Sequence, residues 1–246
     1  DRYDGTGINV GLQDDGFIGP HIDYQGRLVQ FTATNGGNHG DHVGGTIMGA
    51  GNLNPRNKGM APGVTIKVGY FFQINNSMTN YYNNDSIYIT SASLGATCNG
   101  GYDGNAVTRD QQINSLPHLM HVFSAGNSQS SNCGYGAGSG WGTITGGHKQ
   151  AKNLIAVGAL DDNDGMSGYS SWGPAADGRL KPEVSARGSA VISTGAGNSY
   201  YTASGTSMAC PGTSGALAQL YHAYRDLNSQ AFPPSELLKA IMMNCA

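Results

Sequence analysis

Five short apolar runs in the first two thirds of the chain most constrain its fold. Each has the length of a strand that is buried on both faces, and together they occupy residues 8–13, 64–68, 86–90, 119–123 and 154–160. Helical patterns lie between and after them, and no linker or internal repeat interrupts the series. Buried strands that alternate with helices form a mostly parallel sheet with helices on both faces. We therefore expect a single α/β domain over residues 1–246.

The helical patterns differ in strength. Small and apolar residues after His39 indicate a packed helix, and residues 107–116 have weak helical character that a proline ends. Two patterns close the chain, at about residues 208–226 and 234–243. Residues 75–85 are polar, and there we expect a connection without a clear amphipathic helix.

The charge balance and the length of the apolar stretches exclude two classes of partner, nucleic acids and membranes. Only 12% of the residues are charged, the formal net charge is −3, and Lys and Arg form no run. A nucleic-acid partner bound through a basic surface is therefore not expected. No apolar stretch is long enough to span a bilayer and no signal peptide is visible, so we expect no membrane segment.

Four cysteines lie at positions 98, 133, 210 and 245. The first two fall in loops rich in Gly and Asn, and the other two lie on or beside the closing helices. An even number of cysteines is typical of an oxidising compartment, but four cysteines allow three pairings. Four small buried thiols are the alternative.

Three chemically reactive residues occupy strand ends and helix starts. Asp14 follows the first apolar run, His39 begins a helical pattern, and Ser207 begins the longest one, just after Gly205. A helix N-terminus has unpaired N–H groups and partial positive charge, so it can stabilise an oxyanion beside a serine. Taken singly, the aspartate is a turn residue and the serine a helix cap. His39 and His42 have the spacing of a metal-binding pair, but no third ligand with zinc-site spacing lies near them.

Taken together, these residues indicate nucleophilic catalysis. An open α/β sheet gathers reactive groups at the carboxyl ends of its strands, and the order Asp, His, Ser is one of three known for the same catalytic triad. Asn127 lies shortly after the fourth apolar run, either as a turn residue or as a side-chain donor to an oxyanion. The acidic loop at residues 161–165 offers oxygen ligands for calcium but lacks EF-hand spacing, which favours a solvated loop.

The motifs that carry these residues resemble those of the subtilisin-like serine proteases, the subtilases. Gln13–Gly16 resembles the family's aspartate block, His39–Val43 its histidine block, and Gly205–Ala209 matches its serine block in full. Supporting blocks lie in family order over nearly the whole chain, at residues 59–62, 93–95, 125–127 and 171–174.

The resemblance implies a role for each matching residue. Ser207 is expected to attack the scissile carbonyl, His39 to transfer the proton, and Asp14 to orient the imidazole. The Asn127 side chain and the backbone N–H of Ser207 are expected to form the oxyanion hole. The expected substrate-binding residues, which line the S1 pocket and pair with the substrate backbone, are Ser93, Leu94, Gly95, Ser124, Ala125 and Gly126.

The sequence argues against two other functions, a serine esterase and a binding domain. A serine esterase of the α/β-hydrolase type places its histidine after the serine, whereas His39 precedes Ser207. A binding domain that keeps the fold without the chemistry usually lacks a triad member or the oxyanion asparagine, and all four are present here.

The chain also departs from the family's usual pattern. Asp15 and Asp41 replace small hydroxyl residues, and as neighbouring negative charges they are expected to raise the pKa of His39. The pairs Cys98–Cys133 and Cys210–Cys245 are expected disulfides, the second if the closing helices run antiparallel. Residues 143–149 differ near the floor of the S1 pocket, which leaves the preferred P1 residue open.

The family also implies a setting. We expect the secreted, processed catalytic core of a longer precursor, inhibited by its own propeptide, that acts as a monomer on polypeptides with broad specificity. Structural calcium is expected, although no ligand set can be named from the sequence, and no organic cofactor is expected.

Overall fold

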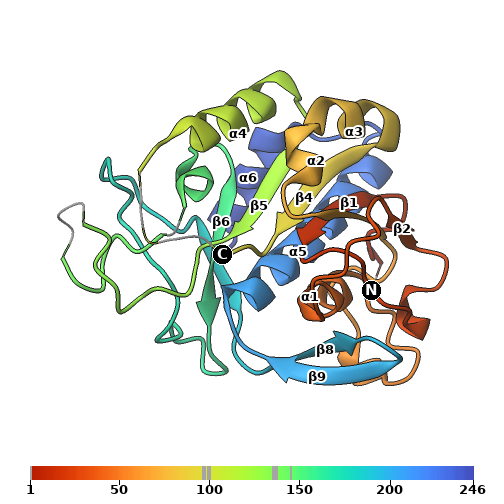
Figure 1. Ribbon diagram of the computed structural model, residues 1–246. Coiled ribbons are helices and arrows are strands. Elements are labelled where there is room, and N and C mark those ends of the chain that lie inside the picture. Colours follow the sequence, from red (N-terminus) through yellow and green to blue (C-terminus); the bar gives the residue numbers. More distant parts are fainter. Residues whose placement is uncertain (1, 96–97, 99–100, 135–137, 145) are drawn as a thin grey trace.

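A parallel sheet forms the centre of the molecule in the computed structural model, which describes residues 2–95, 98, 101–134, 138–144 and 146–246. The sheet has seven strands in the order β2-β3-β1-β4-β5-β6-β7. A separate antiparallel hairpin pairs β8 with β9 (Figure 1). The strands are β1 Asn9–Asp14, β2 Leu28–Gln30, β3 Thr65–Tyr70, β4 Ile87–Ala92, β5 Met120–Ser124, β6 Ile155–Leu160, β7 Val184–Arg187, β8 Val191–Gly195 and β9 Ser199–Ala203.

Helices cover both faces of this sheet, as expected (Figure 1). On one face α1 and α5 pack against each other and against the strands, with α6 beside α5. On the other face α2 contacts β1 and β3, α3 contacts β4, and α4 contacts β5. The helices are α1 His39–Met48, α2 Gln73–Asn76, α3 Met78–Asp85, α4 Gly104–Ser115, α5 Thr206–Leu227 and α6 Ser235–Asn244, and the short 3₁₀ turns are η1 Ile22–Tyr24, η2 Pro55–Asn57 and η3 Gly147–Gln150.

Alternating side chains divide the buried interior into two cores. In β5, Val122 belongs to the core beneath α1 and α5, while its neighbour Phe123 belongs to the core beneath α2, α3 and α4. Ile155 and Ala156 of β6 divide in the same way. Successive side chains of a strand point to opposite faces, so a strand covered on both faces is mostly apolar along its whole length. This is why continuous apolar runs identified the central strands correctly.

The order of the strands creates one place where chemistry can gather. The chain forms β1, then builds β2 and β3 on one side of it, and afterwards adds β4 to β7 on the other side. Asp14 is the last residue of β1, and Ser93 directly follows β4. Ligands of open α/β sheets bind outside the carboxyl ends of the strands where the order reverses, which here lies at β1 and β4.

One region differs from the sequence-based expectations. The polar stretch 75–85 contains α3, because Met78 is buried while Tyr81 and Tyr82 pack partly buried against the same core. Polar residues on the outer face hid the apolar side of this short helix. The Gly-rich run around residues 193–199 forms most of the β8–β9 hairpin, which packs against α1.

One of the two expected disulfides is present. Cys98 and Cys133 are bonded, with their Cα atoms 5.0 Å apart. The expected Cys210–Cys245 bridge is wrong, because Cys210 is buried and Cys245 is exposed, and both are free thiols. The Cys210 sulfur lies 3.8 Å from the Ala92 carbonyl and 3.7 Å from the Val122 carbonyl, so it packs against the sheet and away from α6.

Among the described helices, none combines the length and the apolar character that crossing a bilayer requires.

Candidate active site

A short hydrogen bond joins the last residue of β1 to the first residue of α1. His39 Nδ1 lies 2.6 Å from Asp14 Oδ1, which also accepts the Asp15 backbone N–H at 2.9 Å. Asp14 is 2% exposed, while the His39 ring is partly open to solvent. A carboxylate in this position fixes both the tautomer and the direction of the ring, and leaves Nε2 free for proton transfer.

The environment of His39 favours its protonated form. Burial lowers its pKa, but the hydrogen bond and charge of Asp14 outweigh burial, and the charge of Asp15 adds to them, so the pKa of His39 is raised. The expected influence of Asp15 is therefore present. The Asp41 carboxylate turns to the backbone N–H of Gly19 at 2.9 Å, and burial raises the pKa of Asp41 itself to about 6.

Ser207 lies in the first turn of α5 and exchanges hydrogen bonds with Ser93. The Ser93 hydroxyl donates to the Ser207 carbonyl at 2.9 Å, and the Ser207 hydroxyl donates to the Ser93 carbonyl at 3.4 Å. Pro211 explains why the Ser207 carbonyl is available. A proline in a helix has no N–H to donate to the carbonyl four residues earlier, and that carbonyl belongs to Ser207.

Asn127 follows β5 and is held by the residue before Ser207. Its Oδ1 accepts both the backbone N–H and the hydroxyl of Thr206, each at 2.9 Å. With Oδ1 fixed in this way, the Nδ2 group is left to donate elsewhere. Sequence reasoning assigned Thr206 no separate role, although Thr206 stands inside the serine block.

Two hydrogen-bond donors converge on a space beside Gly205. A methyl group built on Gly205 would lie 3.3 Å from Asn127 Nδ2 and 3.6 Å from the Ser207 backbone nitrogen. An oxygen atom within this space would have both donors at close range, as an oxyanion hole requires. Glycine at position 205 keeps the space empty.

The structure thus brings Asp14 together with His39, and Ser207 together with Asn127 and Ser93. Among the described residues, the Ser207 hydroxyl donates to the Ser93 carbonyl and makes no hydrogen bond with His39. Catalytic hydrogen bonds are often long or misaligned until substrate binds.

The expected substrate-binding residues lie where β4 and β5, which are neighbours, leave the sheet. Several of their backbone groups already have partners. The Gly126 N–H donates to the Thr206 hydroxyl at 3.1 Å, and the Leu94 carbonyl accepts from Lys149 at 2.8 Å. In these six residues, only Gly95 is exposed.

Lys149 is a residue that sequence reasoning did not single out. It lies in η3, is fully buried, and holds the Leu94 carbonyl from inside the protein. Burial lowers its pKa to about 7. No sequence pattern predicts this contact, because the partner is a backbone carbonyl 55 residues away.

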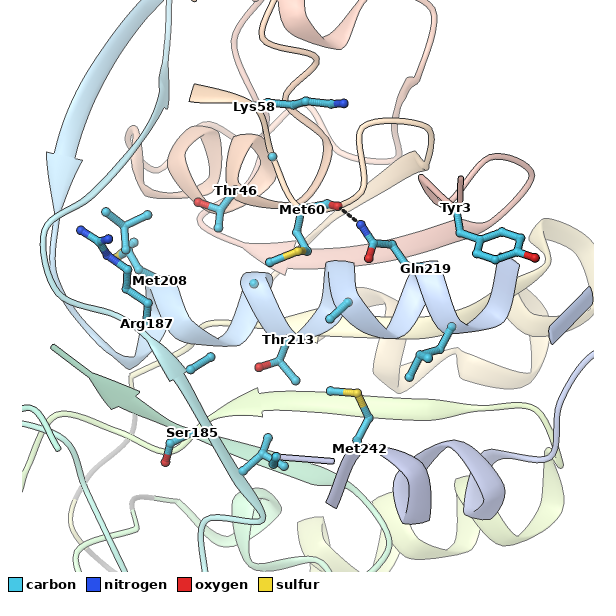
Figure 2. Close-up of a pocket in the computed structure, with 18 of the residues that line it drawn as sticks. Tyr3, Thr46, Lys58, Met60, Ser185, Arg187, Met208, Thr213, Gln219 and Met242 are labelled. Atoms are coloured by element: carbon cyan, nitrogen blue, oxygen red, sulfur yellow. Dashed lines mark hydrogen bonds between the residues drawn. The ribbon is translucent and has the colours of Figure 1, made fainter. Parts of the chain in front are cut away.

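A large cavity lies apart from these groups. It has a volume of about 1090 Å³ and runs along the side of α5. The segment around Met60 lines one side of it, and strand β7 and helix α6 line the other. Figure 2 shows Met208, Thr213 and Gln219 along this side of α5, with Gln219 hydrogen-bonded to the Met60 carbonyl. Neither His39 nor Asn127 lines this cavity.

No group of three or more His, Cys, Asp or Glu side chains among the described residues is placed to hold a metal ion. His42, the candidate partner of His39 in a metal pair, turns its Nε2 to the Val191 carbonyl at 3.0 Å. In the loop at residues 161–165, Asp161 Oδ1 accepts the backbone N–H groups of Asn163 and Gly165 and so closes the turn.

Comparison with known proteins identifies the family of this chain. The model of the subtilase family matches residues 5–246. The chain is 30% identical to subtilisin DY of Bacillus licheniformis over 244 residues, which cover 92% of this chain and 81% of that protein. It is 28% identical to thermitase of Thermoactinomyces vulgaris, with 89% of this chain and 77% of that protein covered.

Some relatives are much longer. The chain matches subtilisin-like protease 5 of Arthroderma benhamiae at 29% identity but spans 54% of its length. Among solved structures, a cold-adapted subtilisin-like serine proteinase superposes with a TM-score of 0.70 at 22% identity, over 98% of this chain and 83% of that one. This structural likeness supports the fold.

Proposed function

Because the chain belongs to the subtilase family and is a subtilisin-like serine protease, we propose that Asp14, His39 and Ser207 form its catalytic triad. The substrates are polypeptides, and the bonds cleaved are internal peptide bonds. The observation that carries the proposal is the 2.6 Å contact between His39 Nδ1 and Asp14, at the end of the sheet where α5 begins with Ser207 in its first turn.

The first half of the reaction forms an acyl-enzyme. Ser207 Oγ attacks the scissile carbonyl carbon while His39 Nε2 takes the hydroxyl proton, and the carbonyl oxygen becomes an oxyanion. Asn127 Nδ2 and the Ser207 N–H stabilise this oxyanion, a contribution of roughly 2.7–4 kcal/mol for the asparagine of such a hole, a magnitude that was established on subtilisin. His39 then gives its proton to the leaving amine, and Asp14 stabilises the imidazolium throughout.

The second half repeats these steps with water. Water attacks the acyl carbon as His39 accepts its proton, and the returning proton restores the Ser207 hydroxyl when the acid product leaves. Before the first attack the Ser207 hydroxyl must rotate from the Ser93 carbonyl toward His39. That rotation gives up one hydrogen bond of 3.4 Å, which is long for an O–H donor and therefore weak.

The finer features of the function are part of the same proposal. The substrate-binding residues are the ends of β4 and β5, and specificity is broad. The Cys98–Cys133 disulfide supports secretion, since such bonds persist in oxidising compartments. We further propose a monomer that is inhibited by its own propeptide and stabilised by calcium.

The test is a titration with phenylmethylsulfonyl fluoride, followed by release of p-nitroaniline from a panel of peptide anilides. We expect one equivalent of inhibitor to abolish activity and to form an adduct on Ser207, which peptide mass spectrometry locates. Ser207→Ala is the matched control and should give neither cleavage nor adduct. A folded wild-type protein that neither cleaves nor reacts, with or without calcium, would overturn the proposal in favour of a binding domain.

A further inference from the structure

Asp15 caps the helix that begins at the candidate general base. Its Oδ2 accepts the backbone N–H of His39 at 3.1 Å, and its Oδ1 accepts that of Gly40 at 2.8 Å. The residue next to the helix, Asn38, makes no capping bond with its side chain. Since the first N–H groups of a helix have no partner within it, Asp15 supplies from the end of β1 what the local sequence does not.

The glycines around this carboxylate allow its close approach. A methyl group built on Gly40 would lie 2.7 Å from Asp15 Oδ1, and one built on Gly37 would lie 2.9 Å from Asp15 Oδ2. Gly36 donates its backbone N–H to the Asp15 carbonyl at 2.7 Å. Side chains at these positions would push the carboxylate away from the helix, so the segment before α1 is shaped to receive it.

Asp15 also touches the other partner of His39. Its backbone N–H donates to Asp14 Oδ1, the same oxygen that contacts His39 Nδ1. The two consecutive aspartates therefore hold the histidine at two points. Asp14 holds the ring, and Asp15 holds the backbone from which the ring projects.

We propose that Asp15 is a positioning residue for His39, which fixes the start of α1 so that the imidazole stays on Asp14. This rests on the proposed function, in which His39 is the general base. It goes further by assigning a role to Asp15, which stands where the family's aspartate block usually has a small hydroxyl residue. A hydroxyl offers one acceptor oxygen, whereas the Asp15 carboxylate offers two, one for the N–H of His39 and one for that of Gly40.

The charge of Asp15 gives the proposal a second, independent readout. The titratable groups around His39 are Asp14 and Asp15 at the end of β1, Asp41 and His42 on α1, and Tyr201 on β9. Of these, the two consecutive aspartates raise the pKa of His39, while Tyr201 donates its hydroxyl to the Asn38 carbonyl. Removing the Asp15 charge should therefore lower the pKa of His39.

Three variants test the role of Asp15. Asp15→Ala removes both capping bonds and the charge, and Asp15→Asn removes the charge but keeps one acceptor oxygen. Asp103→Asn is the matched control, since Asp103 also accepts two backbone N–H groups at a helix start, those of Asn105 and Ala106, both on its Oδ1. Each protein is first checked by circular dichroism and by the fraction that reacts with the inhibitor.

We expect Asp15→Ala to lower kcat on the order of tenfold or more with little change in KM, because a misplaced catalytic group slows the chemical step. Asp15→Asn should recover part of this loss. The acid limb of the kcat/KM profile should move to lower pH in both variants, since His39 must be neutral to act as the base. The control should leave kcat and the acid limb unchanged.

A measurement without turnover separates this proposal from the proposed function. In a Ser207→Ala background, NMR titration of the His39 ring reports its pKa directly, and Asp15→Asn should lower that pKa while Asp103→Asn should not. Wild-type kcat together with an unmoved His39 titration in folded Asp15→Ala or Asp15→Asn would overturn the positioning role. Failure of the proposed function would instead appear as loss of inhibitor labelling in the wild-type protein.

Discussion

Helices α1 and α4 are both capped at their N-terminus by an aspartate side chain that accepts two backbone N–H groups. The two aspartates come from different parts of the chain. Asp103 directly precedes α4 and caps it through Asn105 and Ala106. Asp15 caps α1 from the end of β1, 24 residues earlier in the chain than His39. A local cap stabilises one helix, whereas a distant cap also fixes that helix relative to a strand.

The two caps differ more in the geometry that they fix than in the stability that they contribute. A capping side chain contributes about 0.5–2 kcal/mol wherever it comes from, so the two aspartates have comparable energies. The cap of α1 joins two elements that carry partners in the proposed reaction, Asp14 on β1 and His39 on α1, whereas the cap of α4 does not. Variants at each helix should therefore separate effects on rate from effects on stability.

The largest expected effect lies at α1. Asp14→Asn should lower kcat by about 10⁴-fold, the cost of replacing the aspartate of such a triad, because the amide favours the wrong imidazole tautomer. The measurement is kcat with a peptide anilide, on protein shown to be folded. A loss below tenfold would mean that the short contact with His39 does not orient the ring.

Next in size is the effect of removing a covalent link between two loops. The Cys98–Cys133 bond closes a loop with a sequence separation of 35, and on the chain-entropy model its loss costs about 3–4 kcal/mol. A Cys98→Ser/Cys133→Ser double variant in the Ser207→Ala background should lose this much free energy of unfolding in urea. An unchanged midpoint would show that the link is not what stabilises this side of the sheet.

A third prediction concerns Asp41, in the first turn of α1. A helix start favours negative charge and so lowers the pKa of a carboxyl group. At Asp41 the effect of burial is larger and raises the pKa from 3.8 to about 6. The folded state therefore holds this proton more tightly than the unfolded state, so stability falls as the pH rises from about 4 to about 6 and stays lower above that range.

The substitution that removes this penalty is Asp41→Asn, whose amide oxygen can still accept the Gly19 N–H. It should increase stability at pH 8 relative to its effect at pH 4, by at most about 3 kcal/mol, the equivalent of the shift. Urea unfolding at the two pH values checks this. An effect of equal size at both pH values would contradict it.

The smallest effect is expected at the local cap. Asp103→Ala should lower the free energy of unfolding by about 1 kcal/mol and leave the kcat/KM profile unchanged. The readouts are urea unfolding and the pH dependence of peptide anilide cleavage. A shifted acid limb in this variant would remove the distinction between the two helices.

Sequence reasoning succeeded where a structure depends on neighbouring residues or on a strong pattern. The central strands were identified because burial on both faces demands continuous apolar runs, and α5 and α6 because their periodicity is long. The three blocks placed Asp14, His39 and Ser207 on the elements that carry them in the structure. Judged by residue type alone, each of these three residues also had a simpler, non-catalytic interpretation. Only the presence of all three together favoured a catalytic site.

It failed where contacts join distant parts of the chain. The Cys210–Cys245 pairing assumed that two closing helices bring their ends together, but Cys210 faces the sheet at the ends of β4 and β5. The same limit applies to Lys149 and to the capping bonds of Asp15. In each case the partner is a backbone group whose position is set by the completed fold.

The paired hydrogen bonds between Ser93 and Ser207 have a consequence for anyone who redesigns this protein. Ser93 belongs to the proposed wall of the substrate cleft, and Pro211 leaves the Ser207 carbonyl for it to hold. Reshaping the cleft at Ser93 would therefore also shift Ser207, the proposed nucleophile. Selectivity and turnover are not independent design variables at this position, and a library that varies residue 93 alone should yield both changes together.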